Sequence, residues 1–340
     1  MKQTASPGMI ASPFKKLQAR RSAGMAIPGK VPDRVLRPGP GERPRQERRA
    51  PLVPSLGCFL SQISIIGLVL SLSAAACAGQ DETTNSMVSS NRVAGNIATN
   101  STASSNNITG SASLAVLSQY IFRGYQIGKN SVVLQPTATA EYRGLAVTFW
   151  GNVDTQEHAT PNFVPDRPGQ GSFNEADVSL SYTHNLGKLS LSGGIWYYGT
   201  QYMDDTEELF VSATYDVITK PTLTVYRDIN SFPATYYNLS LAHSIPVGHG
   251  LTVDLGAAAG YLAGDCNLYQ TEGGTGPVYS AFHDGMVKVG LTIPVAKDWV
   301  VQPVVQYYFP LSEAAGRTGY NPCGELDQDF VYGVSATFSF

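Results

Sequence analysis

Apolar and polar residues alternate along most of the chain after Gly110. In the last segment, Phe330, Tyr332 and Val334 fall on one face, and Ser335 and Thr337 fall on the other. A period of two residues is that of a β-strand with two different faces, and no segment after Gly110 keeps helical periodicity for three turns. Residues 111–340 are therefore expected to be all-β.

The alternating runs predict twelve strands of about 9–14 residues each. Strands of soluble proteins average roughly 5–6 residues, whereas about 9–11 tilted residues cross a bilayer. The expected strands are 112–123, 132–142, 145–154, 174–185, 189–200, 206–217, 222–230, 235–247, 251–264, 282–295, 299–311 and 329–340.

Short and mostly longer connections alternate between these strands, which is the pattern of periplasmic turns and external loops in a transmembrane barrel. A soluble β-sandwich would also show alternating residues, but strand length, loop order and the terminal Phe340 favour a barrel. The fold prediction is a transmembrane antiparallel β-barrel of about twelve strands over 111–340. The short turns are 143–144, 186–188, 218–221, 248–250 and 296–298, and the longer connections are 124–131, 155–173, 201–205, 231–234, 265–281 and 312–328.

The first 110 residues have two other compositions. Residues 1–80 hold twelve basic and three acidic side chains, and an uncharged apolar run at 56–76 ends in Ala74-Ala75-Ala76. A basic flank, an apolar core and an A-x-A end are the parts of a secretory signal peptide, so 1–78 is predicted to be a basic extension plus signal peptide. The extension suggests a start codon assigned too far upstream. The alternatives are a transmembrane anchor, and a lipoprotein modified at Cys77.

Residues 79–110 are rich in Ser, Thr, Asn and Gly, so a polar disordered linker is expected there. Together these parts predict export by a signal peptide to the bacterial outer membrane.

Charge supports this division. Charged residues make up 14% of the chain, against about 25% in ordinary soluble domains, and the net charge is -3. Residues 111–340 hold only ten basic but twenty-one acidic side chains. An acidic barrel with no basic patch is not expected to bind nucleic acid.

One stretch resembles a known family. Ser118-Gln119-Tyr120-Ile121-Phe122-Arg123-Gly124, followed by Arg143-Gly144-Leu145 and Trp150-Gly151-Asn152, is similar to the Gcw_chp family of TorF-like porins. The acidic strand start at Glu175 and the stretch Gly194-Ile195-Trp196-Tyr197-Tyr198 are similar too, although Gln119 stands where the family often has Asp. The resemblance covers 111–265 and implies an outer-membrane location more than a substrate.

Strand parity predicts which charged residues face the barrel interior. A lumen with mostly acidic side chains concentrates cations, so the leading hypothesis is a cation-preferring porin for small solutes. The alternative is that these groups pair within a packed, closed interior, since twelve strands lie between filled and open barrels. The expected pore-lining residues are Arg123, Glu141, Asp154, Glu175, Asp177, Asp216, Asp228, Asp254, Asp284 and Lys288.

Arg123, at the end of the first expected strand, has two alternative interpretations. It could hold a loop inside the pore as a constriction, or pair with a carboxylate on a neighbouring strand for stability.

The remaining candidates point to no enzyme, metal or cofactor. Tyr182-Thr183-His184-Asn185 faintly resembles an outer-membrane phospholipase strand, but His184 falls on the lipid-facing parity with no clustered nucleophile. A lipid hydrolase is therefore third, after a porin and a structural or adhesin barrel.

Two cysteines belong to the expected barrel. Cys266 and Cys323 lie in long external loops that neighbour each other in a barrel, so a disulfide between them is predicted. The acidic group Asp204, Asp205, Glu207 and Glu208 could bind divalent cations that bridge lipopolysaccharide, or be a solvated loop. The expected partners are outer-membrane lipid, lipopolysaccharide and small solutes or cations.

Overall fold

A computed structural model describes residues 107–160, 164–272, 274–316 and 326–340. The predicted signal peptide at 1–78 and most of the predicted linker at 79–110 lie outside the described residues. The linker boundary at 110 is two residues too late, because the first strand already begins at Thr109.

Twelve antiparallel strands close into a barrel, which confirms the predicted fold and strand number. β1 pairs with both β4 and β14, so the sheet has no free edge. The barrel strands are β1 (Thr109–Leu117), β4 (Val133–Tyr142), β5 (Leu145–Asp154), β6 (Ser172–Leu186), β7 (Leu189–Thr200), β8 (Thr206–Tyr215), β9 (Thr222–Asp228), β10 (Ala234–Gly248), β11 (Leu251–Gly264), β12 (Ser280–Ala296), β13 (Trp299–Pro310) and β14 (Asp329–Ser339).

The first predicted strand, 112–123, is wrong at its end. β1 stops at Leu117, and the chain then forms β2 (Tyr120–Phe122) and β3 (Tyr125–Gly128), which pair only with each other. We call β2, β3 and the turn between them the inner hairpin. The barrel wall therefore resumes at Val133 after an excursion that the alternating pattern did not reveal.

Hydrophobic side chains lie on the outside of the barrel and polar ones on the inside. In β6, Leu180 and Tyr182 are 47% and 52% exposed, whereas Asp177 and Ser179 are 0% and 5% exposed. β14 has the same arrangement, with Phe330 and Tyr332 exposed on the outside and Ser335 buried on the inside. An apolar outer band over a polar interior is the arrangement of a transmembrane β-barrel, because lipid contacts the outer face.

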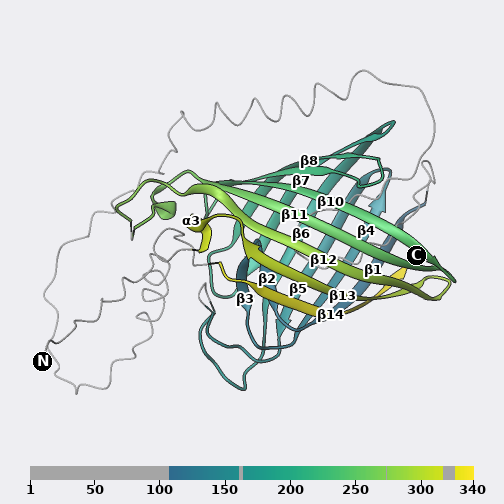
Figure 1. Cartoon of the computed structure of the whole chain (residues 1–340), viewed down its shortest axis with the longest axis horizontal. Coiled ribbons are helices and arrows are strands. Elements are labelled where there is room, and N and C mark those ends of the chain that lie inside the picture. The colour runs from purple at the N-terminus through teal and green to yellow at the C-terminus, as the bar shows by residue number, and fades with distance from the viewer. Residues whose placement is uncertain (1–106, 161–163, 273, 317–325) are drawn as a thin grey trace, which may run out of the picture. The chain divides into compact units, whose positions relative to one another are not determined.

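The two ends of the barrel differ. The connections 143–144, 187–188, 249–250 and 297–298 are tight turns at the end that also holds the C-terminus, on the right of Figure 1. The opposite end carries the connections 118–132, 155–171, 201–205, 229–233, 265–279 and 311–328. The predicted alternation of short turns and longer loops is wrong at one place. Because β8 ends at Tyr215, the turn 216–221 is longer than the loops 201–205 and 229–233.

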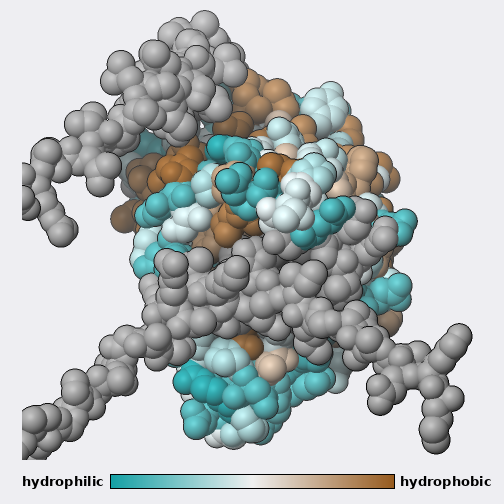
Figure 2. Space-filling model, turned by 90° about the vertical axis from the view of Figure 1, so that its left-hand side faces the viewer, coloured by the Kyte–Doolittle hydropathy of each residue, from teal (hydrophilic) through white to brown (hydrophobic). Residues whose placement is uncertain are grey.

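The long-loop end contains the short helical elements η2 (Asn267–Tyr269) and α3 (Glu313–Gly316). No helix in the described part of the chain is long and apolar enough to cross a membrane. Figure 2 views this end and shows hydrophilic residues in the lower part of the view and hydrophobic residues mainly in its upper part. The inner hairpin belongs to the same end of the barrel (Figure 1).

Candidate functional site

The inner hairpin turns at Arg123 and Gly124. Both residues have positive φ angles, 49° and 78°, as the two central positions of a type I′ turn require. A Cβ at position 124 would lie 2.8 Å from the Asp284 Cβ and 2.9 Å from a Leu326 methyl carbon, so only glycine fits. This turn places Arg123 inside the barrel, 9% exposed.

Aromatic rings attach the hairpin to several strands of the wall. Tyr120 and Ile121 are each only 2% exposed although they belong to no barrel strand. Ring contacts join Tyr120 to Trp150 of β5 at 5.4 Å, Phe122 to Tyr198 of β7 at 6.1 Å, and Tyr125 to His283 of β12 at 5.0 Å. Since these partners come from separate parts of the wall, the hairpin lies across the lumen.

Two glutamines attach the hairpin to β14. The side-chain amides of Gln119 and Gln126 both donate to Asp329 Oδ1, each at 3.2 Å. Gln119 also donates to the Phe330 carbonyl oxygen at 3.0 Å. These bonds hold the base of the hairpin, so its tip is positioned by other contacts.

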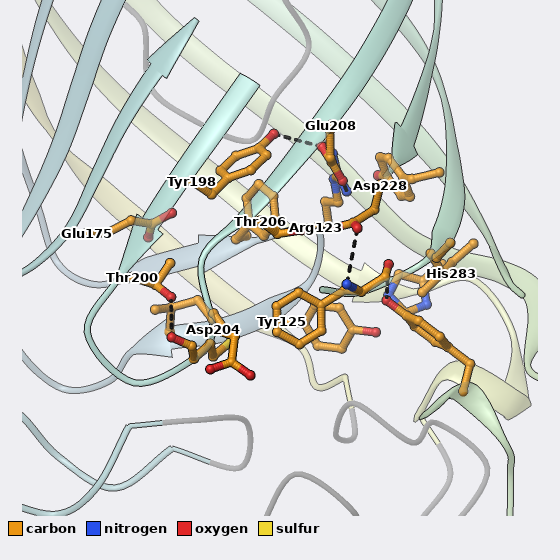
Figure 3. Close-up of a pocket in the computed structure, with 18 of the residues that line it drawn as sticks. Arg123, Tyr125, Glu175, Tyr198, Thr200, Asp204, Thr206, Glu208, Asp228 and His283 are labelled. Atoms are coloured by element: carbon orange, nitrogen blue, oxygen red, sulfur yellow. Dashed lines mark hydrogen bonds and ion pairs between the residues drawn. The ribbon is translucent and has the colours of Figure 1, made fainter. Parts of the chain in front are cut away.

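At the tip, Arg123 forms a bidentate ion pair with Glu208 of β8. The two terminal guanidinium nitrogens, Nη1 and Nη2, donate to the carboxylate, each at 2.7 Å, and the Tyr198 hydroxyl donates to Glu208 Oε2 at 2.8 Å (Figure 3). Glu208 is 6% exposed. Buried charges need such partners, because an unpaired one would carry a large desolvation cost.

Three aromatic rings surround the same guanidinium. The Arg123 Cζ lies 4.4 Å from the ring centroid of Tyr236, 4.7 Å from that of Tyr226 and 4.8 Å from that of Phe122. Rings within about 6 Å of a cation attract it through their quadrupole. We call Glu208, Tyr226, Tyr236 and Phe122 the Arg123 cage.

A cavity of about 110 Å³ adjoins the cage. Its carboxylates come from Glu175, Asp204, Glu208 and Asp228, and Figure 3 shows these residues around the labelled Arg123. Arg123 is the one lysine or arginine among the described residues that line it. The cavity is therefore an acidic and aromatic space beside a single fixed cation.

Neighbouring polar groups fix the wall of this cavity. Asp228 accepts a hydrogen bond from the Thr206 hydroxyl at 2.7 Å and from the backbone amides of Asn230 and Phe232 at 3.0 and 3.1 Å. The Tyr236 hydroxyl donates to Asp284 Oδ1 at 2.8 Å. Asp228 and Tyr236 are thus held in place independently of Arg123.

The predicted pore-lining residues fall into three groups. Asp154, Glu175, Asp177, Asp228 and Asp284 are buried in the interior at the long-loop half of the barrel. Glu141, Asp254 and Lys288 are half-buried in the turn half, where Asp254 accepts hydrogen bonds from Ser244 and Thr292.

The last two predicted residues are not on barrel strands. Arg123 faces the interior from the inner hairpin, and its partner carboxylate lies across the lumen rather than on a neighbouring strand. Asp216 follows the end of β8 and forms an ion pair with Lys220, 3.8 Å away, in the turn before β9. The prediction of Asp216 as a strand residue is therefore wrong, because the strand stops at Tyr215, where the turn begins.

Glu208 is the main site residue that the sequence prediction leaves out of the pore-lining set. It falls in the expected strand 206–217 but is grouped there only with Asp204, Asp205 and Glu207 as an acidic cluster, whereas it is a buried residue of β8. The alternation of β8 places Glu208 on the same face as Ser212, which points inward. That parity was the signal available for it, and also for Tyr226, which lies on the same face of β9 as Asp228. Parity could not show that these side chains would meet Arg123.

Beyond the hairpin, hydroxyl groups line the interior in cross-strand pairs. Ser212 and Thr224 are 2.9 Å apart, Thr214 and Thr222 are 2.9 Å apart, and Thr139 and Thr148 are 3.0 Å apart. In the turn half of the barrel these interior side chains are small, and Thr222, Thr224 and Ser335 are each only 1% exposed. The ring contacts across the interior are instead at the inner hairpin.

The loop after β5 is anchored to the loop after β7. Glu157 is 0% exposed and accepts hydrogen bonds from Arg167 Nε at 2.8 Å and from the Tyr202 hydroxyl at 2.6 Å. Burial, and then the hydrogen bond to Glu157, raise the pKa of Tyr202. The buried carboxylate of Glu157 therefore joins these two loops at the long-loop end of the barrel.

The cysteine and histidine candidates lie as follows. Cys266 precedes η2 in the loop after β11 and is half-buried, and Cys323 lies outside the described residues, so their disulfide stays a prediction. His184 is exposed on the outer face and pairs in register with Leu191. His283 is 0% exposed, and its Nδ1 is 2.8 Å from the Tyr279 hydroxyl.

Comparison with models of known protein families and with curated proteins finds no match for this chain. The resemblance to the Gcw_chp family is therefore not confirmed.

Three outer-membrane channels are among the solved structures to which this chain is similar. The NanC porin is 9% identical, with 69% of this chain and 100% of that chain covered and a TM-score of 0.42. An outer-membrane channel from Pseudomonas putida F1 is 8% identical, with 70% and 97% covered and a TM-score of 0.40. An anion-selective porin from Comamonas acidovorans is 12% identical, with 69% and 99% covered and a TM-score of 0.29. At these scores the similarity carries no argument about the function of this chain.

Proposed function

We propose that this protein is an outer-membrane porin that passes small solutes and prefers cations. The observation that supports it most is the barrel itself, with an apolar outer band and an interior of hydroxyls and carboxylates. Such a surface is stable only where lipid covers it, and a closed barrel leaves no backbone group unpaired in the hydrocarbon. Export by the signal peptide predicted at 1–78, and contact with lipopolysaccharide at the external rim, belong to the same proposal.

Cation preference follows from the charges in the interior. Seven of the ten predicted pore-lining residues are carboxylates on barrel strands that face inward, and Arg123 and Lys288 are the two cations of that set. A low-dielectric wall with one dominant sign of charge concentrates counter-ions and repels ions of the same sign.

The inner hairpin occupies the long-loop end of the lumen, so the proposed conducting path passes the cavity beside Arg123. Toward the turns the proposed path is lined by small hydroxyl side chains. We propose that the described arrangement is the closed or most constricted state of the pore.

Reversal potentials across planar bilayers test this function. Purified barrel is placed in a salt gradient, and the wild-type protein is compared with a variant in which residues 119–130 are replaced by a short glycine-serine linker. We expect small cation-selective currents from the wild type and larger ones from the variant. The absence of conductance in both proteins, or a preference for anions in the variant, would contradict the proposal.

A non-conducting structural or adhesin barrel is the second candidate. The aromatic packing of the inner hairpin across the lumen favours it, because Tyr120 and Ile121 are as buried as core residues of a soluble protein. An adhesin would depend on the loops 155–171, 265–279 and 311–328, so their replacement would abolish attachment without changing conductance. We propose no enzymatic activity, since His184 faces outward and His283 contacts a tyrosine rather than a nucleophile.

A further inference from the structure

Arg123 is held in the manner of a bound ligand rather than as part of the wall. It belongs to the inner hairpin, whose two strands pair only with each other. Its guanidinium meets both oxygens of Glu208 at 2.7 Å and lies over the rings of Tyr226 and Tyr236 at 4.7 and 4.4 Å. A bidentate carboxylate together with aromatic faces is also how proteins recognise free guanidinium groups.

The wall supplies this cage without help from the hairpin, except for Phe122. Glu208 comes from β8, Tyr226 from β9 and Tyr236 from β10, three successive strands of the barrel. The Tyr198 hydroxyl and Asp284 orient Glu208 and Tyr236 through hydrogen bonds of 2.8 Å each. The cage would therefore keep its shape if Arg123 moved out.

A second cation can reach the cage through the adjoining cavity. The space of about 110 Å³ holds several water molecules, since a single water needs only roughly 10–15 Å³ of such volume. Glu175, Asp204 and Asp228 line it together with Glu208. These carboxylates favour the entry of a cation and disfavour that of an anion.

Replacing Arg123 by another cation beside Glu208 costs less free energy than withdrawing Arg123 alone. If the hairpin left with Arg123, Glu208 would remain buried close to Asp228 with no cation beside it. An uncompensated buried carboxylate is strongly unfavourable, so the empty cage opposes opening. A cation that takes the place of Arg123 removes this opposition.

We infer that the Arg123 cage is a binding site for small organic cations with a guanidinium group, which the protein occupies with its own side chain in the described state. Binding of such a cation displaces Arg123 and releases the inner hairpin from the mouth. This inference rests on the proposed porin function for its consequence, but the cation site itself does not. It names guanidinium compounds as the solute class that opens the pore.

The site is tested with guanidinium chloride as the ligand and the folded full-length barrel in detergent. Arg123→Ala empties the cage, and the melting temperature is measured in low-millimolar guanidinium chloride and in sodium chloride of equal concentration. We expect guanidinium to stabilise Arg123→Ala more than the wild type, in which Arg123 competes for the same site. In Arg123→Ala/Glu208→Gln the difference between the salts should vanish. Equal melting of Arg123→Ala in both salts, or a difference that persists without Glu208, would overturn the assignment.

Arg123→Met serves if the alanine variant does not fold, because it keeps a long unbranched side chain but leaves Glu208 without a cation. It should show the same guanidinium-specific gain, and no gain would overturn the assignment. Conductance then separates the two proposals. Guanidinium added at the loop side should raise the wild-type current above that in sodium chloride, and an unchanged current in a conducting barrel would refute the release of the hairpin. A barrel that never conducts but shows the salt-specific melting contradicts only the porin function.

Discussion

Arg123 and Glu208 are 85 positions apart in the chain, yet two hydrogen bonds of 2.7 Å join them inside the barrel. One residue belongs to a hairpin in the lumen and the other to the wall. The pair therefore couples the position of the hairpin to the stability of the whole barrel.

Replacing Arg123 by alanine should destabilise the barrel by about 3–5 kcal/mol, because Glu208 would lose its buried counter-ion. Urea unfolding followed by tryptophan fluorescence in detergent or lipid vesicles measures this change. Arg143→Ala is the matched control: Arg143 occupies the corresponding place in the turn between β4 and β5, with a φ of 50°, but its side chain is exposed. Equal losses in the two variants would show that the buried ion pair contributes nothing special.

Gly124→Ala should displace the inner hairpin. The left-handed conformation costs an L-residue roughly 1–2 kcal/mol, and the added Cβ would also meet Asp284 and Leu326 at under 3.0 Å. Gly187→Ala separates the two effects, since Gly187 has a φ of +61° but a Cβ there would meet nothing within 4 Å. The free energy of unfolding should therefore fall more in Gly124→Ala, together with a rise in conductance. A similar loss of unfolding free energy in both variants would mean that the contacts of the added Cβ with Asp284 and Leu326 cost nothing.

Leu180→Arg should destabilise the membrane-inserted barrel by about 2–4 kcal/mol, because Leu180 lies midway along β6 on the outer face. Ser181→Arg is the control, since Ser181 is adjacent and faces the interior. Folding into lipid vesicles, followed by the heat-dependent shift in electrophoretic mobility, compares the two. A larger loss for Ser181→Arg would invert the assignment of the two faces.

Cys266 and Cys323 should be bridged in the exported protein. Titration of thiols in the unfolded chain without reductant is expected to find none in a mature chain that begins after residue 78. Adding reductant should then expose two thiols and lower the midpoint of thermal unfolding, because the bridge restrains two long loops. A full thiol signal before reduction would refute the disulfide.

The wall could be predicted from the sequence because its pattern is local. On each strand, lipid and lumen impose opposite demands on successive residues, as Leu180 and Ser181 illustrate. Strands such as 145–154, 189–200 and 251–264 have the predicted bounds without change. Their closure into a ring then follows from their number and from the need to pair every edge.

Residues 118–128 resisted prediction because their pattern is ambiguous. Tyr120 and Phe122 alternate with other residues as in a wall strand, but in the inner hairpin both faces contact protein. The Arg123-Gly124 turn has the same two residue types as the Arg143-Gly144 turn, so the repeated dipeptide was a usable signal for a second hairpin. It could not show on which side of the wall the hairpin would lie.

The sequence by itself determined the twelve strands, the outward face of each and the acidic character of the interior, since these depend on neighbouring residues and on the solvent each face meets. Only the tertiary structure decided that the chain turns inward after Leu117 and that Arg123 meets Glu208, Tyr226 and Tyr236. The reason is physical: those partners come from three strands that meet Arg123 only after the barrel has closed. The site forms only when the barrel closes, whereas the strands of the wall follow from the alternation of residues along the chain.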